Sequence, residues 1–116
     1  MDLKREMEKT IAVLTLIYFF SLAFDLTVSV SNFVIDKEYF MKYEINQIFK
    51  NALNYDLIAL IAITAILSVP FCLSFMSFYL SKKLEGIPLI VMYAITFMSL
   101  LITSVGHLLG GLTWLI

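Results

Sequence analysis

Cysteine and histidine are scarce in this sequence of 116 residues, which holds one of each, Cys72 and His107. A single cysteine excludes an intrachain disulfide and a cysteine-rich metal site. The formal net charge is −1, so the chain offers no strongly basic face for nucleic acid. The sequence also lacks glycine-rich phosphate loops, a nucleophile elbow and paired cysteines. Local motifs therefore identify no catalytic residue, and we favour a protein that is not an enzyme.

Hydrophobic residues, by contrast, make up 61% of the chain, and most of them lie in three long runs. Soluble domains average about 45–50% apolar residues, and about 20 apolar residues in helical form cross the hydrocarbon core of a bilayer. The runs cover residues 10–35, 57–80 and 88–113. We therefore predict an all-α integral membrane bundle of three transmembrane helices, forming one transmembrane domain over residues 1–116. The lipid bilayer is its first expected partner.

Local signals place one end and one bend of the second span. Asp56 is a suitable N-cap for it. Pro70 lies near its middle, where a proline removes a backbone donor and bends a helix. Thr64 and Ser68 precede this proline, and we expect their hydroxyls to bond to the backbone of the same helix.

The segment between the first and second spans has a helical pattern of its own. Ile45, Ile48 and Ala52 recur at steps of three and four, and Lys42 lies on the opposite side. This spacing predicts an amphipathic helix at about residues 38–54 that lies in the membrane interface. A short helix packed on the end of the bundle fits the same pattern, so both interpretations stay open.

A polar stripe runs along one face of the first span. At about 100° per residue, it contains Tyr18, Ser21, Asp25, Ser29 and Asn32. A charged carboxylate inside a membrane helix costs roughly 2.5–3.5 kcal/mol on insertion scales. Asp25 should therefore face protein, face water or be protonated. We expect the other helices to cover the stripe, because unpaired polar groups in hydrocarbon are penalised.

The third span carries a second polar stripe, which includes Thr103, His107 and Gly110. Gly106 and Gly110 have the G-x-x-x-G spacing that lets two membrane helices approach closely. We predict that these two glycines serve helix packing.

Asp25, Glu44 and His107 come from three separate parts of the chain, and the predicted topology brings them towards one membrane face. Two carboxylates and one imidazole fit a zinc or iron site with open coordination positions. Supporting polar groups would come from the stripes and the connecting segment: Tyr18, Ser21, Ser29, Asn32, Asn46 and Thr103. A simpler interpretation pairs Asp25 with His107, or with polar neighbours, as a hydrogen bond that joins two helices.

Lysine and arginine are distributed unevenly between the two expected membrane faces. The first nine residues and the 81–86 turn carry five of them: Lys4, Arg5, Lys9, Lys82 and Lys83. Residues 36–56 carry three. By the positive-inside rule we predict a cell-membrane protein with a cytoplasmic N-terminus and a C-terminus outside.

The sequence D-L-T at residues 25–27, followed by E-I-N at 44–46, resembles a family of short three-span membrane domains of bacteria and archaea whose function is unknown. Members carry D-x-x-T near the end of the first span and E-x-N-P in the connection after it. The likeness covers about residues 20–50, with Thr27 one position closer to the aspartate and Gln47 in place of the proline. The resemblance implies that the acid and the E-x-N motif act together near one membrane face, and it implies no activity.

The two polar stripes and the glycine pair favour a helix-packing accessory subunit of a larger membrane complex or of a homo-oligomer. Its partners would be other integral membrane subunits or further copies of itself, and not nucleic acid. A second hypothesis is a membrane-embedded metal-binding protein, or a metal-dependent hydrolase, that uses Asp25, Glu44 and His107 near the outer leaflet. A third is an oligomer that conducts protons or ions through Asp25.

Overall fold

The computed structural model describes residues 2–116 and is helical throughout, apart from short turns. Three helices are each long and apolar enough to cross a membrane: α1 (Leu3–Ile35), α4 (Leu57–Leu80) and α5 (Gly86–Thr113). Two short helices connect α1 to α4: α2 (Lys37–Tyr43) and α3 (Gln47–Leu53). The predicted all-α class with three long apolar helices is confirmed.

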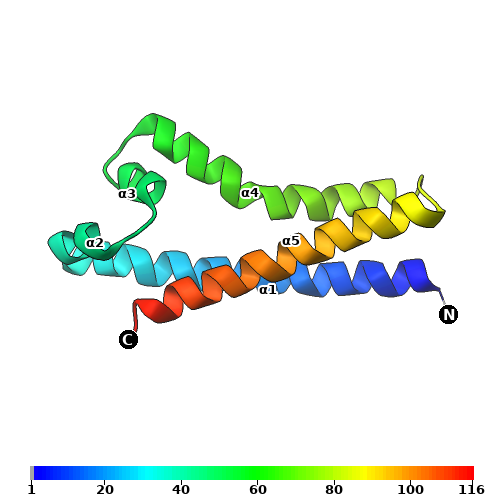
Figure 1. Ribbon diagram of the computed structural model, residues 1–116, viewed down its shortest axis with the longest axis horizontal. Coiled ribbons are helices and arrows are strands. Elements are labelled where there is room, and N and C mark those ends of the chain that lie inside the picture. The colour runs from blue at the N-terminus through cyan, green and yellow to red at the C-terminus, as the bar shows by residue number, and fades with distance from the viewer. Residues whose placement is uncertain (1) are drawn as a thin grey trace.

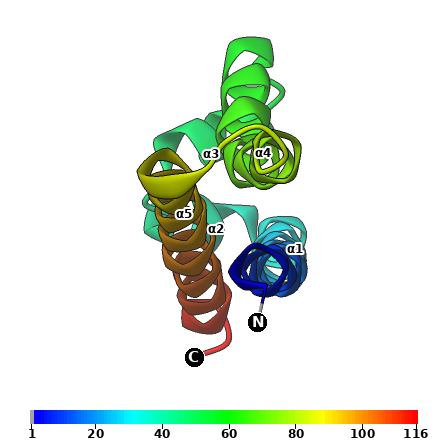
Figure 2. The same ribbon diagram turned by 90° about the vertical axis from the view of Figure 1, so that its right-hand side faces the viewer.

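The three long helices form a bundle in which α1 and α5 run parallel and α4 runs antiparallel to both (Figure 1). α5 crosses α1 and packs against it more extensively than any other pair of helices does within residues 2–116. Seen along its long axis, the bundle is triangular (Figure 2). The N-terminus and the α4–α5 turn lie at one end, whereas α2, α3 and the C-terminus lie at the other (Figure 1).

Side-chain caps explain where four of the helices begin. In each, an aspartate or asparagine oxygen accepts a hydrogen bond from a backbone N–H in the first turn, which satisfies a donor that has no partner within the helix. The capping residues are Asp2 for α1, Asp36 for α2, Asn46 for α3 and Asp56 for α4. The expected cap at Asp56 is confirmed. α5 begins instead at Gly86, whose φ of +65° suits a glycine.

The connecting segment forms two short helices, and the single helix predicted at about residues 38–54 is wrong. Glu44 Oε1 accepts a hydrogen bond from the backbone N–H of Asn46 at 2.9 Å. Asn46 Oδ1 in turn accepts from the N–H of Phe49 at 3.1 Å. These side-chain acceptors compete with helical bonding. The backbone therefore turns extended at residues 44 and 46, where α2 ends and α3 begins.

The segment packs on the end of the bundle, as the second interpretation expected. Phe40 of α2 is fully buried. Its ring stacks on Trp114, just after α5, with 5.1 Å between centroids. The same ring meets Phe33 of α1 and Phe49 of α3 edge-on. One aromatic side chain thus joins four parts of the chain.

α4 bends near its middle, where Pro70 lies (Figure 1). The half before the bend leads away from α1 and α5 towards α3 (Figure 1). Thr64 and Ser68 bond to backbone oxygens of their own helix, as expected. Tyr18 of α1 donates its hydroxyl to the backbone oxygen of Leu67 at 2.6 Å. This contact fixes the bend against α1.

Beyond the bend, polar pairs join the three long helices. We call them the hydroxyl seam: Thr15 with Ser74 at 2.7 Å, Ser77 with Thr96 at 2.5 Å, and Ser81 with Glu8 at 2.6 Å. The three serines are buried and recur at steps of three and four. These serines were not predicted as contacts, although their spacing places them on one helix face.

Candidate functional site

A pocket of about 490 Å³ lies where α4 diverges from α1 and α5. The half of α4 before Pro70 leads away from the other two long helices (Figure 1), and its residues Ile63 and Leu67 line the pocket. We call this space the end pocket. Its lining comes from all five helices and the turn at residues 44–46: Asp25, Leu26, Ser29, Tyr39, Tyr43, Glu44, Ile45, Asn46, Phe49, Ile63, Leu67, His107, Gly110, Thr113 and Trp114.

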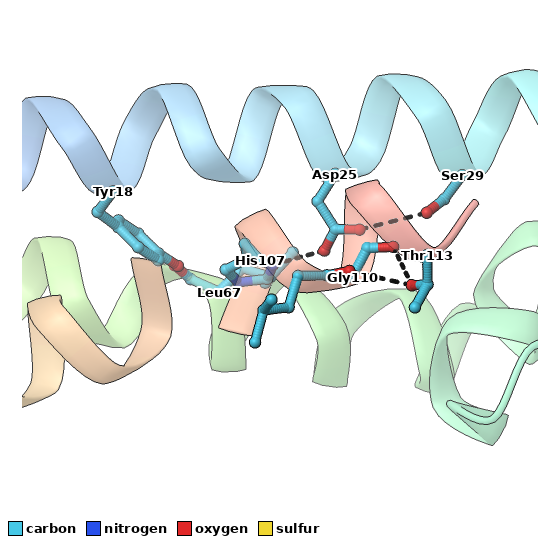
Figure 3. Close-up of polar contacts among 8 residues, drawn as sticks. Tyr18, Asp25, Ser29, Leu67, His107, Gly110 and Thr113 are labelled. Atoms are coloured by element: carbon cyan, nitrogen blue, oxygen red, sulfur yellow. Dashed lines mark hydrogen bonds and ion pairs between the residues drawn. The ribbon is translucent and has the colours of Figure 1, made fainter. Parts of the chain in front are cut away.

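Asp25 and His107 meet in the wall of the end pocket (Figure 3). Asp25 Oδ2 lies 2.7 Å from His107 Nδ1, and Ser29 donates its hydroxyl to Asp25 Oδ1 at 3.4 Å. Both side chains of the pair keep 20% of their surface exposed. α1 and α5 are therefore joined by a direct contact between Asp25 and His107, as the simpler interpretation of the sequence predicted. Both side chains stay accessible from the pocket.

Two adjacent glycines let α5 approach α1 at this point. A Cβ on Gly110 would lie 3.0 Å from Asp25 Oδ1, and a Cβ on Gly111 would overlap the ring of Phe24. Gly106 is exposed, and a Cβ there would have no neighbour within 4 Å among the described residues. The predicted packing role of Gly106 therefore does not apply within this chain, because the residue lies on the outer side of α5.

Glu44 and Asn46 line the same pocket as Asp25 and His107. The structure thus brings all three residues of the predicted site to one place. One carboxylate oxygen of Glu44 accepts the backbone N–H of Asn46, so part of its bonding capacity is used locally. Asn46 is engaged as the N-cap of α3.

Asp25, Glu44 and His107 nevertheless do not form the predicted zinc or iron site. No group of three or more His, Cys, Asp or Glu side chains in residues 2–116 is placed to hold a metal ion. Asp25 and His107 contact each other directly, whereas the hydrogen bond of Glu44 goes to a backbone N–H. The ligand set is not assembled because Glu44 does not join the pair.

The other polar residues expected around the site serve helix contacts or their own backbone. Tyr18 and Ser21 are buried. Asn32 and Thr103 donate to backbone oxygens of their own helices, at 2.9 and 2.5 Å. These four side chains do not line the end pocket. The ring of Tyr18 lies 5.7 Å from that of His107, so it packs behind the imidazole.

Four aromatic residues also line the end pocket, and they were not predicted from the sequence as part of a site. They are Tyr39 and Tyr43 of α2, Phe49 of α3, and Trp114 after α5. The ring centroids of Tyr39 and Tyr43 lie 4.5 Å apart, and those of Tyr39 and Trp114 lie 6.3 Å apart. The spacing of Tyr39 and Tyr43 could have indicated a shared helix face. No local signal links them to Trp114.

The chemistry of the pocket wall combines two carboxylates and one imidazole, with no lysine or arginine. A carboxylate that binds one imidazole nitrogen orients the ring and leaves the second nitrogen for another partner. In residues 2–116, the hydrogen bond of His107 is made by Nδ1. The Nε2 atom is therefore left to bind a polar group of a ligand.

No protein-family model, no curated protein and no solved structure matches this chain. The resemblance to the family with D-x-x-T and E-x-N-P motifs stays a prediction, as does ion conduction through Asp25. The function must therefore be argued from the pocket and the surface of the bundle.

Proposed function

We propose that this protein is a multi-pass membrane protein that binds a small organic ligand in the end pocket, next to the Asp25–His107 pair. The placement of this pair carries the proposal. The two side chains lie 2.7 Å apart in the wall of a pocket of about 490 Å³. Ligand pockets typically measure about 300–1,000 Å³ and combine apolar walls with a few convergent polar groups. The end pocket has both properties.

The cost of the pair supports a binding role over helix adhesion alone. An ionisable residue within a membrane span is expensive and usually marks a functional site. Uncharged hydroxyls suffice to join helices, as Thr15 with Ser74 and Ser77 with Thr96 do at the other end of the same bundle. The Asp25–His107 pair also faces a cavity, where a joint between two helices would need no open side.

A pocket-filling substitution tests the proposal. Ile63 lines the end pocket, and Ile63→Trp should fill it without touching Asp25 or His107. Ile66→Trp is the matched control, because Ile66 is 53% exposed on the same helix and does not line the pocket. We expect native mass spectrometry of protein extracted from its own membrane to find a non-protein mass above the 13.3 kDa chain. Ile63→Trp should lose this mass and Ile66→Trp should keep it. Equal retention by both variants would refute the proposal.

A second candidate function is that of a helix-packing subunit of a larger membrane complex or of a homo-oligomer. It is supported by Gly106, an exposed glycine on the outer side of α5 with open space where a Cβ would lie. Small residues at membrane helix surfaces let a second helix approach closely. The partner would be another integral membrane subunit or a second copy of this chain.

Gly106→Leu tests this second function, because the new side chain has room within the monomer and would obstruct only a partner helix. We expect the wild-type protein to migrate in mild detergent with the mass of more than one chain, and Gly106→Leu to release single chains. A wild-type protein that is monomeric in its native lipids would exclude the subunit role.

We also infer that the end pocket faces the outside of the cell membrane. The end that holds the N-terminus and the 81–85 turn carries more lysine and arginine than the end that holds α2 and α3, and positive charge favours the cytoplasmic side. In a Cys72→Ser background, a membrane-impermeant thiol reagent should label Asn46→Cys in whole cells and leave Lys83→Cys unlabelled. The reverse pattern would invert the orientation.

A further inference from the structure

The charge of the end pocket selects the kind of ligand that it can hold. Asp25 and Glu44 line it, and no lysine or arginine does. The Glu44 side chain is partly exposed, and its hydrogen bond within residues 2–116 uses Oε1. A carboxylate has two acceptor oxygens. Glu44 can therefore offer Oε2 to a cationic group of a ligand.

Two lysines lie near the pocket, and one of them contacts a ring of its lining. Lys50 donates to the backbone oxygen of Met41 at 3.3 Å. The Nζ atom of Lys42 lies 5.2 Å from the centre of the Tyr43 ring. Neither lysine lines the pocket. Lys42 thus already places an ammonium group over the ring of Tyr43, which lines the pocket.

Aromatic rings surround the same region of the pocket. Tyr39, Tyr43 and Trp114 come from α2 and from the residue after α5, and the ring of Tyr39 lies 4.5 and 6.3 Å from the other two. Aromatic faces attract cations within about 6 Å of the ring centre, and groups of such rings recognise substituted ammonium ions. Aromatic rings beside a carboxylate therefore point to a cation, and an anionic head group would be repelled.

Part of the pocket wall is apolar. Ile63 and Leu67 of α4 form it together with Leu26 of α1. An ammonium group held near Glu44 would leave this wall for the hydrocarbon part of the same molecule. The ligand should therefore be an amphiphile.

We infer that the end pocket binds an alkyl-substituted ammonium ion, with the cationic head between Glu44 and the rings of Tyr39, Tyr43 and Trp114 and the alkyl part against Ile63 and Leu67. The inference rests on the proposed function, since it names the ligand class of the same pocket. The ammonium group could belong to a soluble amine or to the head group of a lipid, and both present the same chemistry to these residues.

Calorimetric titration of the purified protein in a maltoside detergent tests the inference. The soluble probes are hexyltrimethylammonium and hexanesulfonate, which share a chain length and differ in charge. The lipid probes are dihexanoyl phosphatidylcholine and dihexanoyl phosphatidylglycerol, of which only the first carries an ammonium group. We expect binding of hexyltrimethylammonium, of the phosphatidylcholine or of both, and weaker or no binding of the two probes without a cation. Tighter binding of hexyltrimethylammonium would indicate a soluble amine as the ligand, and tighter binding of the phosphatidylcholine would indicate a lipid head group.

Two substitutions locate the cation. Glu44→Gln keeps an acceptor for the Asn46 N–H and removes the charge, and Tyr43→Leu removes one ring. The matched controls are Glu38→Gln and Tyr55→Leu, at exposed positions outside the pocket lining. We expect Glu44→Gln and Tyr43→Leu each to weaken binding about 5-fold or more, and the controls to match the wild type. Unchanged affinity in both test variants, or equal binding of hexanesulfonate, would overturn the inference.

The experiments distinguish a wrong ligand class from a pocket that binds no ligand. If the ammonium probes do not bind, but the wild type retains a native mass that Ile63→Trp loses, the ligand class is wrong and the pocket remains. If an ammonium probe binds Ile63→Trp as well as it binds the wild type, both the inference and the proposed function are wrong.

Discussion

At the end of the bundle that holds the N-terminus, buried hydroxyls join the helices in direct pairs such as Ser77 with Thr96. At the other end, Asp25 and His107 also join two helices, but both stay partly exposed in the wall of the end pocket. The two ends share the same long helices and the same type of interhelical polar contact. They differ in the course of α4, which lies along the bundle after Pro70 and diverges from it before that residue (Figure 1).

The comparison shows how one bend separates a structural region from a binding region. A serine or threonine hydroxyl is satisfied by one neighbour and by its own helix backbone, so a pair of hydroxyls such as Ser77 with Thr96 needs no further partner. A carboxylate and an imidazole have more donor and acceptor sites than one contact uses. The Asp25–His107 pair therefore retains capacity for a ligand. We call the end of the bundle that holds this pair and the end pocket the open end.

The largest expected effect comes from separating α1 and α5 at the open end. Gly111→Leu would place its side chain into the ring of Phe24 and close to the backbone of Asp25. Overpacking typically costs about 1–3 kcal/mol, and we expect a loss of this size in the free energy of unfolding. Reversible unfolding in mixed detergent micelles measures it.

Gly106→Leu is the matched control for this effect, because a Cβ there would meet no neighbour within 4 Å among residues 2–116. We expect its monomer stability to stay within about 0.5 kcal/mol of the wild type. Equal losses in the two variants would mean that the close approach of α5 to α1 at Gly111 is not what stabilises the open end.

A smaller effect on the free energy of unfolding is expected from loss of the Asp25–His107 contact. Interhelical hydrogen bonds in membrane proteins average about 0.6 kcal/mol and reach about 1.7 kcal/mol. We expect a double-mutant cycle with Asp25→Ala and His107→Ala to give a coupling of about 1 kcal/mol, because the distance is short and both groups are polar. A parallel cycle with Asp36→Ala and His107→Ala should give no coupling, since Asp36 is an exposed helix cap. Zero coupling in the first cycle would show that the Asp25–His107 contact does not stabilise the fold.

The smallest expected effect lies in the hydroxyl seam. Ser77→Ala removes the contact with Thr96, but Thr96 keeps a hydrogen bond to the backbone oxygen of Met92 at 3.0 Å. We therefore expect a loss of about 0.6 kcal/mol or less in unfolding free energy. Ligand retention measured by native mass spectrometry should not change. A variant that unfolds readily, or one that loses the ligand, would show that the two ends are not independent.

The three long helices could be predicted because each apolar run is long enough to fix its own structure in a membrane. The stripe that contains Asp25 and the stripe that contains His107 could be predicted as inward faces, because unpaired polar groups are penalised in lipid. The break in the connecting segment was missed. Its apolar spacing is helical, and it is the side-chain acceptors of Glu44 and Asn46 that interrupt it. Hydrophobic periodicity does not reveal where side-chain acceptors compete with the backbone hydrogen bonds of a helix.

Other features depend on tertiary packing that no local pattern records. Gly106 and Gly110 are equivalent in the sequence motif, yet only Gly110 lies against Asp25. Tyr39 and Trp114 are distant in the sequence, and they meet because α2, which packs on α1, brings Tyr39 close to the residue that follows α5. The aromatic residues of the site could therefore be identified only from the structure.

Trp114 gives the open end a further property. It is the single tryptophan of the chain, it lines the end pocket, and it stacks on the buried ring of Phe40. Indole fluorescence responds to local polarity and to charged or quenching groups nearby. The tryptophan emission of the unlabelled protein therefore originates from the pocket wall, and its wavelength and intensity distinguish a wet pocket from a filled one.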